Sequence, residues 1–493
     1  MTGGQTINFG YDNDDLLTSA GAMTITRDPA TGFVTATVLG AIHETRTYDA
    51  YGAEQTYTVT ASGNTLYSVD YGTRDGLGRI TTKTETIQSE THVFGYSYYP
   101  TGGLKDVTKD GNLTAHYEYD ANSNRLVGPG LTASPVYDSQ DRLQTYGNCT
   151  YSYKGDGSLQ TKTCPSGTTA YDYDAFGNLR GVTLPNGTII TYVIDGTHRR
   201  NGKRVNGVLT EGFSYRGQLE PIAWLNANGS VRATFVYGTR PNVPEYMILG
   251  SSSYRLIADQ VGTVRLVADV ASGAVVERTD YDEFGVVLSD SALGIQPFGF
   301  AGGIRDFDSG LTRFGTRDYD PAIGRWTQKD ALLFLGGSSN LYSYIAGDAV
   351  NANDPTGLAS YLCLKPLNAL AEFGGMRPDQ KRSFSEDMWN PLFHEFVCTD
   401  NPNPSLPPIC GGLQSSNGGI LGWGARSQDE FSRERCLQME SKKQGCFDQC
   451  VLGAIQGSRP TIYFLGGYFS GPIQNCQAWA TDALLACYKR CGR

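Results

Sequence analysis

The chain has 493 residues, which is enough for two or more domains with a substantial buried core. It contains 61 glycines and 30 tyrosines but only 6 methionines and 5 tryptophans, a composition that favours many short strands and tight turns over a helical enzyme. The formal net charge is −10. Residues 1–358 carry −11, from 27 basic and 38 acidic residues, and residues 359–493 carry +1, from 13 basic and 12 acidic residues. Neither part has the basic charge typical of a nucleic-acid-binding protein.

A tyrosine–aspartate pattern recurs through the first 300 residues, roughly every 20 residues. Most instances place one or two tyrosines before an aspartate, then a short turn with glycine or asparagine, and then a strand rich in threonine or valine. The instances are residues 48–52, 74–79, 117–126, 137–143, 171–179 and 281–285. The alternation puts the tyrosines on one face of a strand, and the turn residues return the chain antiparallel.

A hairpin of this kind cannot bury its apolar face alone, so we expect neighbouring hairpins to pair in a continuous sheet. An unrelated β-sandwich with tyrosine-rich strands is the alternative.

The most specific motif occupies residues 305–358. It runs through DSGLTRFGTRDYDP (308–321), GRW (324–326), Asp330 and NLYSY (340–344), and it ends in NDPTGL (353–358). A stretch DQVGTVR (259–265) precedes it.

The repeats and this ending together resemble the RHS or YD-repeat proteins, which include the C components of Tc toxins and the teneurins. The resemblance covers residues 1–358 and implies a mainly β fold, in which successive hairpins spiral into a hollow shell around the carboxy-terminal segment. It divides the chain into YD-repeat hairpins (1–290), an RHS-associated core ending in DPTGL (291–358), and a small, helical, cysteine-rich effector domain (359–493). A stretch of 358 residues is short for such a shell, so we expect a partial one.

In this family the chain is cut after the final leucine, which corresponds here to the Leu358–Ala359 bond. Such chemistry needs two carboxylates close together, one to activate water and one to protonate the carbonyl or the leaving amine. Asp330 and Asp354 match the family's positions. Arg325 is the matching basic residue, and it would hold one carboxylate ionised or orient the strand.

Two positions depart from the family's pattern. Asp330 is followed by Ala331 rather than by proline, and Asp348-Ala349 stand where the family has Asn-Pro. Neither departure removes a catalytic carboxylate, but both would alter loop geometry. The alternative is that DPTG is only a turn and that Arg325 is only the structural partner of an aspartate.

After Leu358 the repeats stop and the composition changes. Prolines make residues 402–408 rigid and irregular, and glycines predict a flexible stretch at 411–424. A capping-box pattern at 427–430 predicts a helix that extends to about residue 453. A second helix is predicted from Asn475, because apolar residues follow it at helical spacing.

Nine of the eleven cysteines lie in this tail, which favours an oxidising environment and a disulfide framework. Cys446 and Cys450 lie one turn apart on the first predicted helix, as do Cys487 and Cys491 on the second, so two packed helices could be joined by two disulfides. The alternative of a Cys₄ metal site lacks the usual two-residue gap.

An odd number of cysteines leaves at least one thiol over if all others pair within the chain. Cys476 is the candidate, since a helix amino terminus favours a thiolate. The string NCQAW (475–479) resembles the helix start of permuted papain-like hydrolases and acyltransferases, in which a histidine precedes the cysteine; His394 does so here. The simpler alternative is a core or disulfide-bonded cysteine. The histidine and cysteine spacings of nucleotide deaminases are absent.

Three functions remain open. The first is a polymorphic toxin used against competing bacteria, with its own carboxy-terminal domain as encapsulated cargo and with a delivery machinery and a cognate immunity protein as partners. The second is a non-enzymatic cell-surface or adhesion protein whose tail is a disulfide-stapled interaction domain. The third is an inert remnant. We expect no cofactor, no bound metal and no nucleic-acid partner.

The amino-terminal residues are polar and glycine-rich, without the pattern of a Sec signal peptide. No apolar run reaches the length of about 18 residues that a membrane span needs. We therefore expect either a fragment or a protein that another machine secretes, delivers to a target cell or displays at the cell surface.

Overall fold

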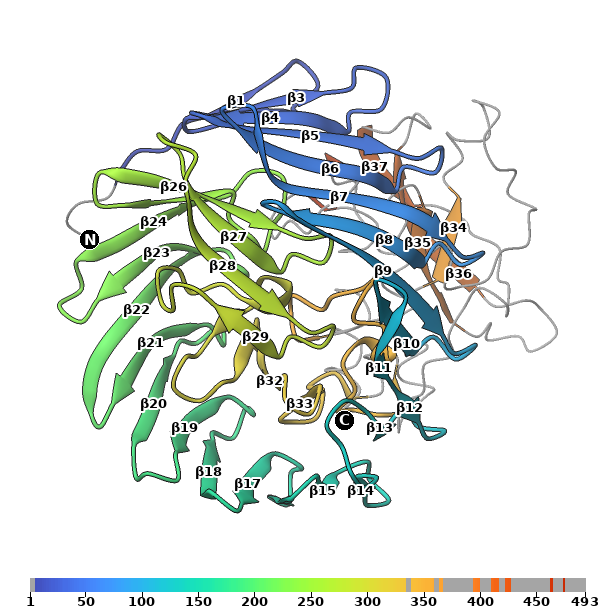
Figure 1. Ribbon diagram of the computed structural model, residues 1–493, viewed down its shortest axis with the longest axis vertical. Helices are drawn as coiled ribbons and strands as arrows, with labels where there is room; N and C mark the ends of the chain where they lie inside the picture. The colour runs from blue at the N-terminus through green and yellow to red at the C-terminus, as the bar shows by residue number, and fades with distance from the viewer. Residues whose placement is uncertain are drawn as a thin grey trace. The chain divides into compact units, whose positions relative to one another are not determined.

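The computed structural model describes residues 5–333 and 338–358, and the backbone of six strands beyond Leu358 (Figure 1). The chain divides into two compact units. The first unit comprises Met1–Leu333 with Ser338–Ala359, and the second comprises Phe334–Gly337 with Ser360–Arg493. The described residues are mainly β, which confirms the expected fold class. No helix among them is both long and apolar enough to pass through a bilayer.

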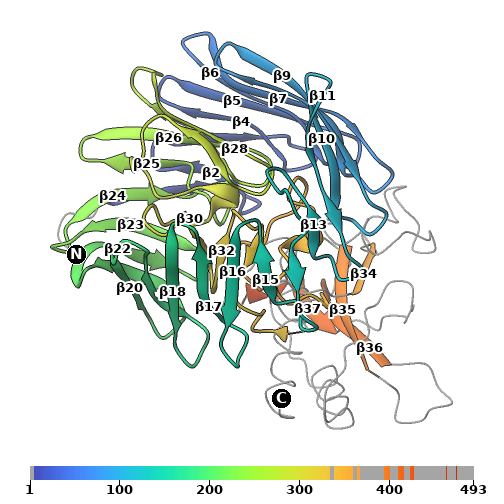
Figure 2. The same cartoon turned by 60° about the horizontal axis from the view of Figure 1, so that its bottom comes forward.

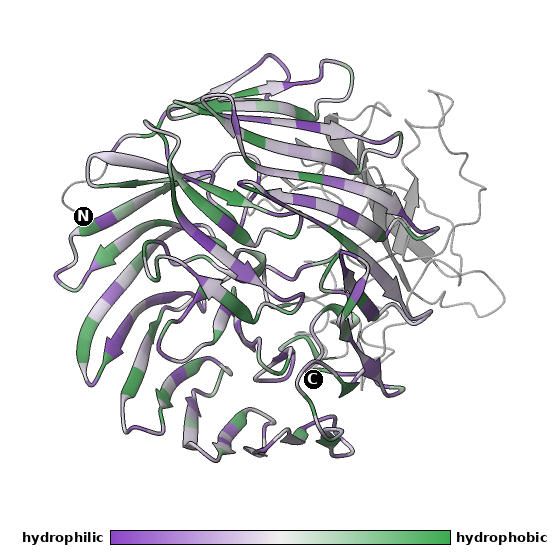
Figure 3. Cartoon of the chain, viewed as in Figure 1, coloured by the Kyte–Doolittle hydropathy of each residue, from purple (hydrophilic) through white to green (hydrophobic). Residues whose placement is uncertain are grey.

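The first unit opens with an eleven-stranded antiparallel sheet in which every strand pairs with its neighbour in the chain. Its strands are β1 (Phe9–Tyr11), β2 (Leu17–Ala20), β3 (Met23–Arg27), β4 (Val34–Leu39), β5 (Ile42–Tyr48), β6 (Glu54–Ala61), β7 (Asn64–Arg74), β8 (Ile80–Ile87), β9 (Glu90–Tyr98), β10 (Leu104–Lys109) and β11 (Asn112–His116). Side chains alternate between buried and exposed along these strands, as β5 illustrates. Figure 3 shows the matching alternation of hydropathy.

A two-stranded sheet, β12 (Glu118–Tyr119) with β13 (Arg125–Val127), follows the first sheet, and a sixteen-stranded antiparallel sheet follows in turn. The latter contains β14 (Val136–Tyr137), β15 (Leu143–Tyr146), β16 (Cys149–Tyr153), β17 (Leu159–Cys164), β18 (Gly167–Tyr173), β19 (Leu179–Thr183), β20 (Ile189–Ile194), β21 (Arg200–Val205), β22 (Val208–Arg216), β23 (Glu220–Asn226), β24 (Val231–Val236), β25 (Tyr246–Leu249), β26 (Ser252–Ala258), β27 (Val264–Asp269), β28 (Val275–Tyr281) and β29 (Val287–Asp290).

The repeated aspartate closes each turn with its own side chain. In the turn after β7, Asp75 Oδ1 accepts the backbone N–H groups of Leu77 at 2.9 Å and Arg79 at 3.0 Å. Gly78 completes the turn at a φ of 79°, a conformation that a side chain disfavours. The same pair of bonds, to residues two and four positions on, is made by Asp49, Asp120, Asp138, Asp174, Asp195, Asp259 and Asp282.

The repeated tyrosine ties each strand to the one before it. Tyr48, at the end of β5, donates its hydroxyl to the carbonyl oxygen of Val34, at the start of β4, at 2.8 Å. Tyr137 donates in the same way to the Arg125 carbonyl at 2.8 Å and so bridges the break between β13 and β14. Equivalent bonds come from Tyr98, Tyr215 and Tyr237. The tyrosine–aspartate pattern therefore has two roles, because the tyrosine links strands and the aspartate builds the turn.

The beginning of the first sheet packs against the later strands of the sixteen-stranded sheet. Figure 2 shows β2 and β4 beside β25 and β26. Nearby, the buried guanidinium of Arg255 in β26 binds Glu44 of β5, and also Glu245 just before β25, each at 2.6 Å. Removing one partner of such a buried group leaves an uncompensated charge, which costs on the order of 3–5 kcal/mol. This contact joins strands that are more than 200 residues apart in the sequence.

The core segment contains a small antiparallel sheet: β30 (Ile304–Arg305), β31 (Thr312–Phe314), β32 (Arg317–Asp320) and β33 (Arg325–Trp326). Two short 3₁₀ turns, η1 (Phe300–Gly302) and η3 (Ile345–Gly347), flank it. In Figure 1 the strands of the first unit curve around β32 and β33. A buried aromatic cluster fixes the segment, with ring centroids 4.7–6.4 Å apart; its members are Phe300, Phe314, Tyr319, Trp326 and Tyr344.

The two cysteines before Leu358 form a disulfide bond. Cys149 begins β16 and Cys164 ends β17, so the bond Cys149–Cys164 links the open ends of one hairpin.

In the second unit the structure describes six strands that form one sheet: β34 (Cys363–Pro366), β35 (Phe393–Thr399), β36 (Ile409–Ser415), β37 (Gly422–Arg426), β38 (Ile462–Tyr463) and β39 (Ile473–Gln474). β36 and β37 include residues 411–415 and 422–424 of the glycine-rich stretch, so these residues form strands where a flexible segment was expected; residues 416–421 lie outside the described residues. Glycine lowers strand propensity, but pairing with neighbouring strands overrides it. The two predicted helices lie outside the described residues.

Candidate self-cleavage site

The core segment is held by ion pairs and hydrogen bonds to strands and turns that are far apart in the sequence. Lys203 of β21 binds Asp306 at 2.8 Å, and Tyr192 of β20 donates to the other oxygen of that carboxylate at 2.6 Å. Gln328 reaches the carbonyl of Gly177 at 2.6 Å. Because these partners lie on several hairpins, the position of the core is set by the sheet as a whole.

The two predicted aspartates meet in this core. The Oδ2 atoms of Asp330 and Asp354 lie 2.8 Å and 3.0 Å from the same Nη2 atom of Arg317. All three side chains are buried, since each aspartate is 5% exposed and Arg317 is 2% exposed. The structure thus brings together two carboxylates that are 24 residues apart in the sequence and places one cation between them.

Arg317 is fixed from three directions. Its Nε donates to the carbonyl oxygen of Gly357, and its guanidinium carbon lies 4.1 Å from the centre of the Trp326 ring. The third contact is the pair of carboxylates. A guanidinium presents several donors in a fixed plane, so one side chain can hold both carboxylates and the loop before the expected cleavage point.

Arg325 does not occupy the position that the sequence suggested. Its guanidinium donates to Asn124 Oδ1 and to the Asp141 carbonyl, each at 2.6 Å, and to Asn340 Oδ1 at 3.3 Å. The register of the core sheet explains this, because Arg325 pairs with Asp320 at the far end of β32 from Arg317. Arg325 therefore anchors the core to the turns of the repeats, and Arg317 takes the place beside the carboxylates.

The loop of residues 354–358 folds back on Asp354. Oδ1 of Asp354 accepts the Leu358 N–H at 3.1 Å and the Thr356 hydroxyl at 3.0 Å. Thr356 Oγ1 lies 3.2 Å from the Leu358 carbonyl oxygen, the oxygen of the bond expected to be cut. Gly357 has a φ of 66°, and a side chain there would crowd the backbone of Phe314 and Arg317. Ala359, on the other side of the bond, lies outside the described residues.

At each of the two positions that depart from the family's pattern, an aspartate closes the local turn. Asp330 Oδ1 accepts the N–H of Leu332 at 2.8 Å, so the turn after Asp330 forms without a proline. Asp348 Oδ1 accepts the backbone N–H of Asn351 at 3.2 Å and its side-chain amide at 2.7 Å. Burial raises the pKa of Asp348 to about 6, although these bonds oppose the rise.

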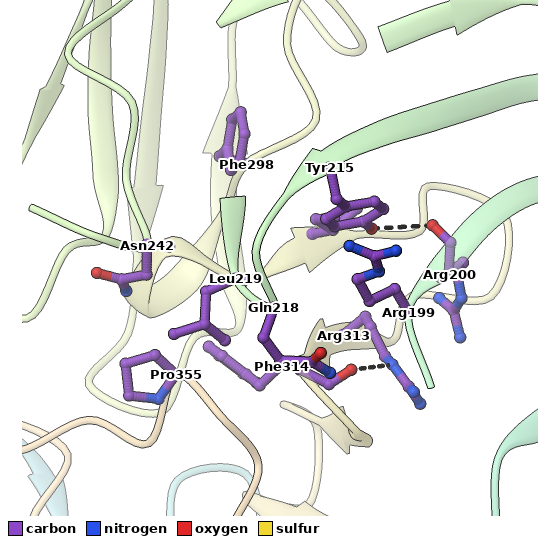
Figure 4. Close-up of a pocket in the computed structure, with 14 residues that line it drawn as sticks. Arg199, Arg200, Tyr215, Gln218, Leu219, Asn242, Phe298, Arg313, Phe314 and Pro355 are labelled. Carbon is purple, nitrogen blue, oxygen red and sulfur yellow. Dashed lines mark hydrogen bonds between the residues drawn. The ribbon is translucent and has the colours of Figure 1, made fainter. Parts of the chain in front are cut away.

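A small cavity adjoins the loop. Its volume is about 30 Å³, and its lining includes Pro355, Gly315 and Arg313 (Figure 4). That volume suits about one water molecule and is far below the roughly 300–1,000 Å³ of a typical small-molecule site. Among the described residues, no group of three or more His, Cys, Asp or Glu side chains could hold a metal ion. The charged groups that the structure brings together beside this loop are two carboxylates and one guanidinium.

The other predicted site residues belong to the second unit. Cys476 and the disulfide candidates Cys446, Cys450, Cys487 and Cys491 lie outside the described residues. His394 lies in β35, opposite Lys365 of β34 in the strand register. The thiol site and the disulfide framework stay predictions.

Comparison with known proteins identifies the family. The Teneurin YD-shell family matches residues 4–346. The chain belongs to this family. Teneurin-4 of Mus musculus is 27% identical over 308 residues, which cover 60% of this chain and 11% of the teneurin. Double-stranded DNA deaminase toxin A of Burkholderia cenocepacia (strain H111) is 26% identical over 333 residues, which cover 60% of this chain and 23% of that toxin. The YD-shell chain thus spans a minor part of these relatives.

Solved structures give a weaker likeness. A crystal structure of TcdB2-TccC3-TEV has a TM-score of 0.40 and 17% identity, and the match covers 68% of this YD-shell chain and 21% of that one. The Photorhabdus luminescens Tc holotoxin pore gives a TM-score of 0.40 and 16% identity, with 69% and 21% covered. The assignment as an RHS or YD-repeat protein, made from the repeats and the DPTGL ending, is confirmed by the family match.

Proposed function

We propose that residues 1–358 are the shell and self-cutting core of a YD-shell toxin, which hydrolyses its own Leu358–Ala359 bond and frees residues 359–493 as an effector. One observation carries the proposal. The carboxylates of Asp330 and Asp354 converge on Arg317, while Asp354 also holds the N–H of Leu358. A purely structural turn does not require two buried carboxylates to share one cation, because their excess negative charge is costly to bury.

The chemistry follows from this arrangement. One carboxylate takes a proton from a water molecule as the water oxygen attacks the carbonyl carbon of Leu358. The carbon–nitrogen bond then breaks as the other carboxyl group, which enters the reaction protonated, gives its proton to the Ala359 nitrogen. The products are a new carboxylic acid and a new amine, and the two aspartates have exchanged protonation states. Arg317 offsets the charge of the pair and keeps the loop close to it through the Gly357 carbonyl.

Intact mass spectrometry under denaturing conditions tests the proposal. The wild-type chain should be found as two fragments that separate between Leu358 and Ala359. Asp330→Asn and Asp354→Asn should each give one uncut chain. An uncut wild-type chain whose shell is folded would refute the self-cleavage proposal.

Asp320→Asn is the matched control. Asp320 is also a buried aspartate of the core, 4% exposed, and it binds a single cation, Lys162, at 3.1 Å. Loss of its charge should leave cleavage intact. If this variant also stayed uncut, the effect of the other two substitutions would reflect general damage to the core.

In a toxin of this kind, the toxic activity would reside in residues 359–493, which self-cleavage releases. In this proposal they are the cargo, which reaches a target cell through a delivery machinery, and the producing cell carries an immunity protein against it. The matched toxin of Burkholderia cenocepacia supports a toxin role for this kind of shell. Expression of residues 359–493 alone in bacteria should arrest growth, whereas the uncut Asp354→Asn chain should not.

The second candidate is a surface-displayed, non-enzymatic protein. The matches to the teneurins favour it. It predicts an uncut chain that remains on the outside of intact cells, which antibody labelling without permeabilisation would detect.

A further inference from the structure

We propose that the Thr356 hydroxyl is the hydrogen-bond donor that stabilises the oxyanion when the Leu358–Ala359 bond is cut. The inference rests on the proposed self-cleavage and adds a catalytic residue to it. Three contacts define the position of this hydroxyl. Thr356 Oγ1 accepts the Leu358 N–H at 3.0 Å, lies 3.0 Å from Asp354 Oδ1, and lies 3.2 Å from the Leu358 carbonyl oxygen.

A threonine hydroxyl has one hydrogen, so it can donate to only one of the two oxygens at a time. Before cleavage the carboxylate of Asp354 is the stronger acceptor, because hydrogen bonds to charged groups are the stronger ones. When water attacks the carbonyl carbon of Leu358, the negative charge moves to the former carbonyl oxygen. The hydroxyl then needs only to rotate about its own bond to donate to that oxyanion.

The backbone holds Thr356 in place for this role. Thr316 donates its N–H to the Thr356 carbonyl oxygen at 3.0 Å, and Arg317 holds the Gly357 carbonyl. The two peptide carbonyls that follow the Thr356 Cα are therefore anchored, and little reorganisation is needed during the reaction. A donor fixed in advance in a buried site is the kind of group that stabilises an oxyanion effectively.

Among the described contacts of the Leu358 carbonyl, the Thr356 hydroxyl is the donor that the structure provides. Arg317 donates to the preceding carbonyl, that of Gly357, and to the two carboxylates instead. Arg317 and Thr356 therefore have different roles. Arg317 positions the two carboxylates and the loop, whereas the Thr356 hydroxyl donates a hydrogen bond to the oxygen on which negative charge develops.

Two matched pairs of residues at position 356 separate the effect of the hydroxyl group from the effect of side-chain shape. Threonine and Thr356→Val have nearly the same shape, and Thr356→Ser and Thr356→Ala differ from each other by the hydroxyl alone. Pulse-labelled chains from cell-free translation would be chased, and the uncut fraction would be followed with time. We expect Thr356→Val to cut about 100-fold or more slowly than wild type, the scale for loss of one oxyanion donor. We expect Thr356→Ser to stay within about tenfold of wild type and Thr356→Ala to match Thr356→Val.

The same substitutions in an Asp330→Asn chain, which is expected to stay uncut, would show by thermal unfolding whether the fold is kept. If Thr356→Val fails to fold, the comparison of the cutting rates of Thr356→Ser and Thr356→Ala tests the role of the hydroxyl. Equal cutting rates for Ser and Ala, or a wild-type rate for Val, would overturn the role of the hydroxyl while self-cleavage stood. A wild-type chain that never cuts would instead remove the proposed function, so the two failures are distinct.

Discussion

Gly315 and Thr356 touch backbone to backbone, with the carbonyl oxygen of Thr356 in the space that a side chain on Gly315 would fill. Gly315 also has a φ of 44°, in the region that side chains disfavour. The loop before Leu358 can lie close to β31 and β32 only because this residue is glycine.

Gly315→Ala should therefore displace the loop and slow self-cleavage. We expect a loss of about 1–2 kcal/mol from the backbone conformation and about 1–3 kcal/mol more from the overlap with Thr356. Thermal unfolding and the fraction of cut chain would measure the two effects.

Gly310→Ala is the control, because Gly310 also has a positive φ, 74°, but nothing lies where its side chain would go. Only the backbone cost applies there, and cleavage should be unaffected. If the two variants lost equal stability, the close contact between Gly315 and Thr356 would not contribute to the cost of the substitution.

Arg317 and Arg325 should differ in what their loss does. Arg317→Gln leaves two buried carboxylates without their shared cation, so we expect a loss of about 3–5 kcal/mol and no cleavage. Arg325→Gln removes hydrogen bonds to Asn124, Asn340 and a backbone carbonyl but leaves the carboxylates paired. It should retain cleavage at a reduced stability, as intact mass and denaturant unfolding would show. If Arg325→Gln keeps a stable fold but is not cut, Arg325 would have to take part in the cleavage reaction, as the sequence suggested.

Glu277 should make stability depend on pH. It lies in β28, 3% exposed, and burial together with the negative charge of Asp290 raises its pKa to about 8. The folded chain keeps this proton between about pH 4.5 and 8 while the unfolded chain releases it, so stability falls as pH rises through that window.

Glu277→Gln removes the titration. Its melting temperature should exceed that of the wild type by roughly 5 °C near pH 8 and approach it near pH 4.5. Parallel pH profiles for wild type and Glu277→Gln would contradict the assignment.

The Cys149–Cys164 bond should stabilise the repeats by restricting the unfolded chain. The bond closes a loop of 15 residues, for which chain entropy predicts about 3 kcal/mol. Dithiothreitol should lower the melting temperature of the wild type. It should have no such effect on the first unit of a chain with Cys149→Ala and Cys164→Ala, in which the cysteines of the tail are still present. An equal response in both chains would place the effect in the tail.

The sequence predicted the parts of this fold that arise from local chemistry. The tyrosine–aspartate pattern predicted the hairpins, since the aspartate turn and the tyrosine link form between near neighbours in the chain. The spacing of Asp330 and Asp354 could be read from the core motif. Arg317 could not be identified, because Arg313, Arg317 and Arg325 are equivalent in the linear pattern.

Strand register determines which of these arginines lies beside the two carboxylates. Arg325 faces Asp320 across β32 and β33, so it points toward the turn of Asn124, while Arg317 at the other end of β32 meets the carboxylates. The four residues of β32, Arg317–Asp320, are all buried although three are charged, but only the structure reveals this burial. The strands β36 and β37 were missed because glycine weakens local propensity while pairing partners distant in the chain restore it.

The neighbour-to-neighbour pairing of the strands has a consequence for the order of events during synthesis. A sheet in which each strand binds the one just made can be laid down as the chain leaves the ribosome, without waiting for distant segments. The core is different, because its partners are spread from Ile80 to Gln260. Under the proposed self-cleavage, we expect Asp330, Asp354 and Arg317 to come together only after these partners are in place, so the tail would stay attached until the repeats are built.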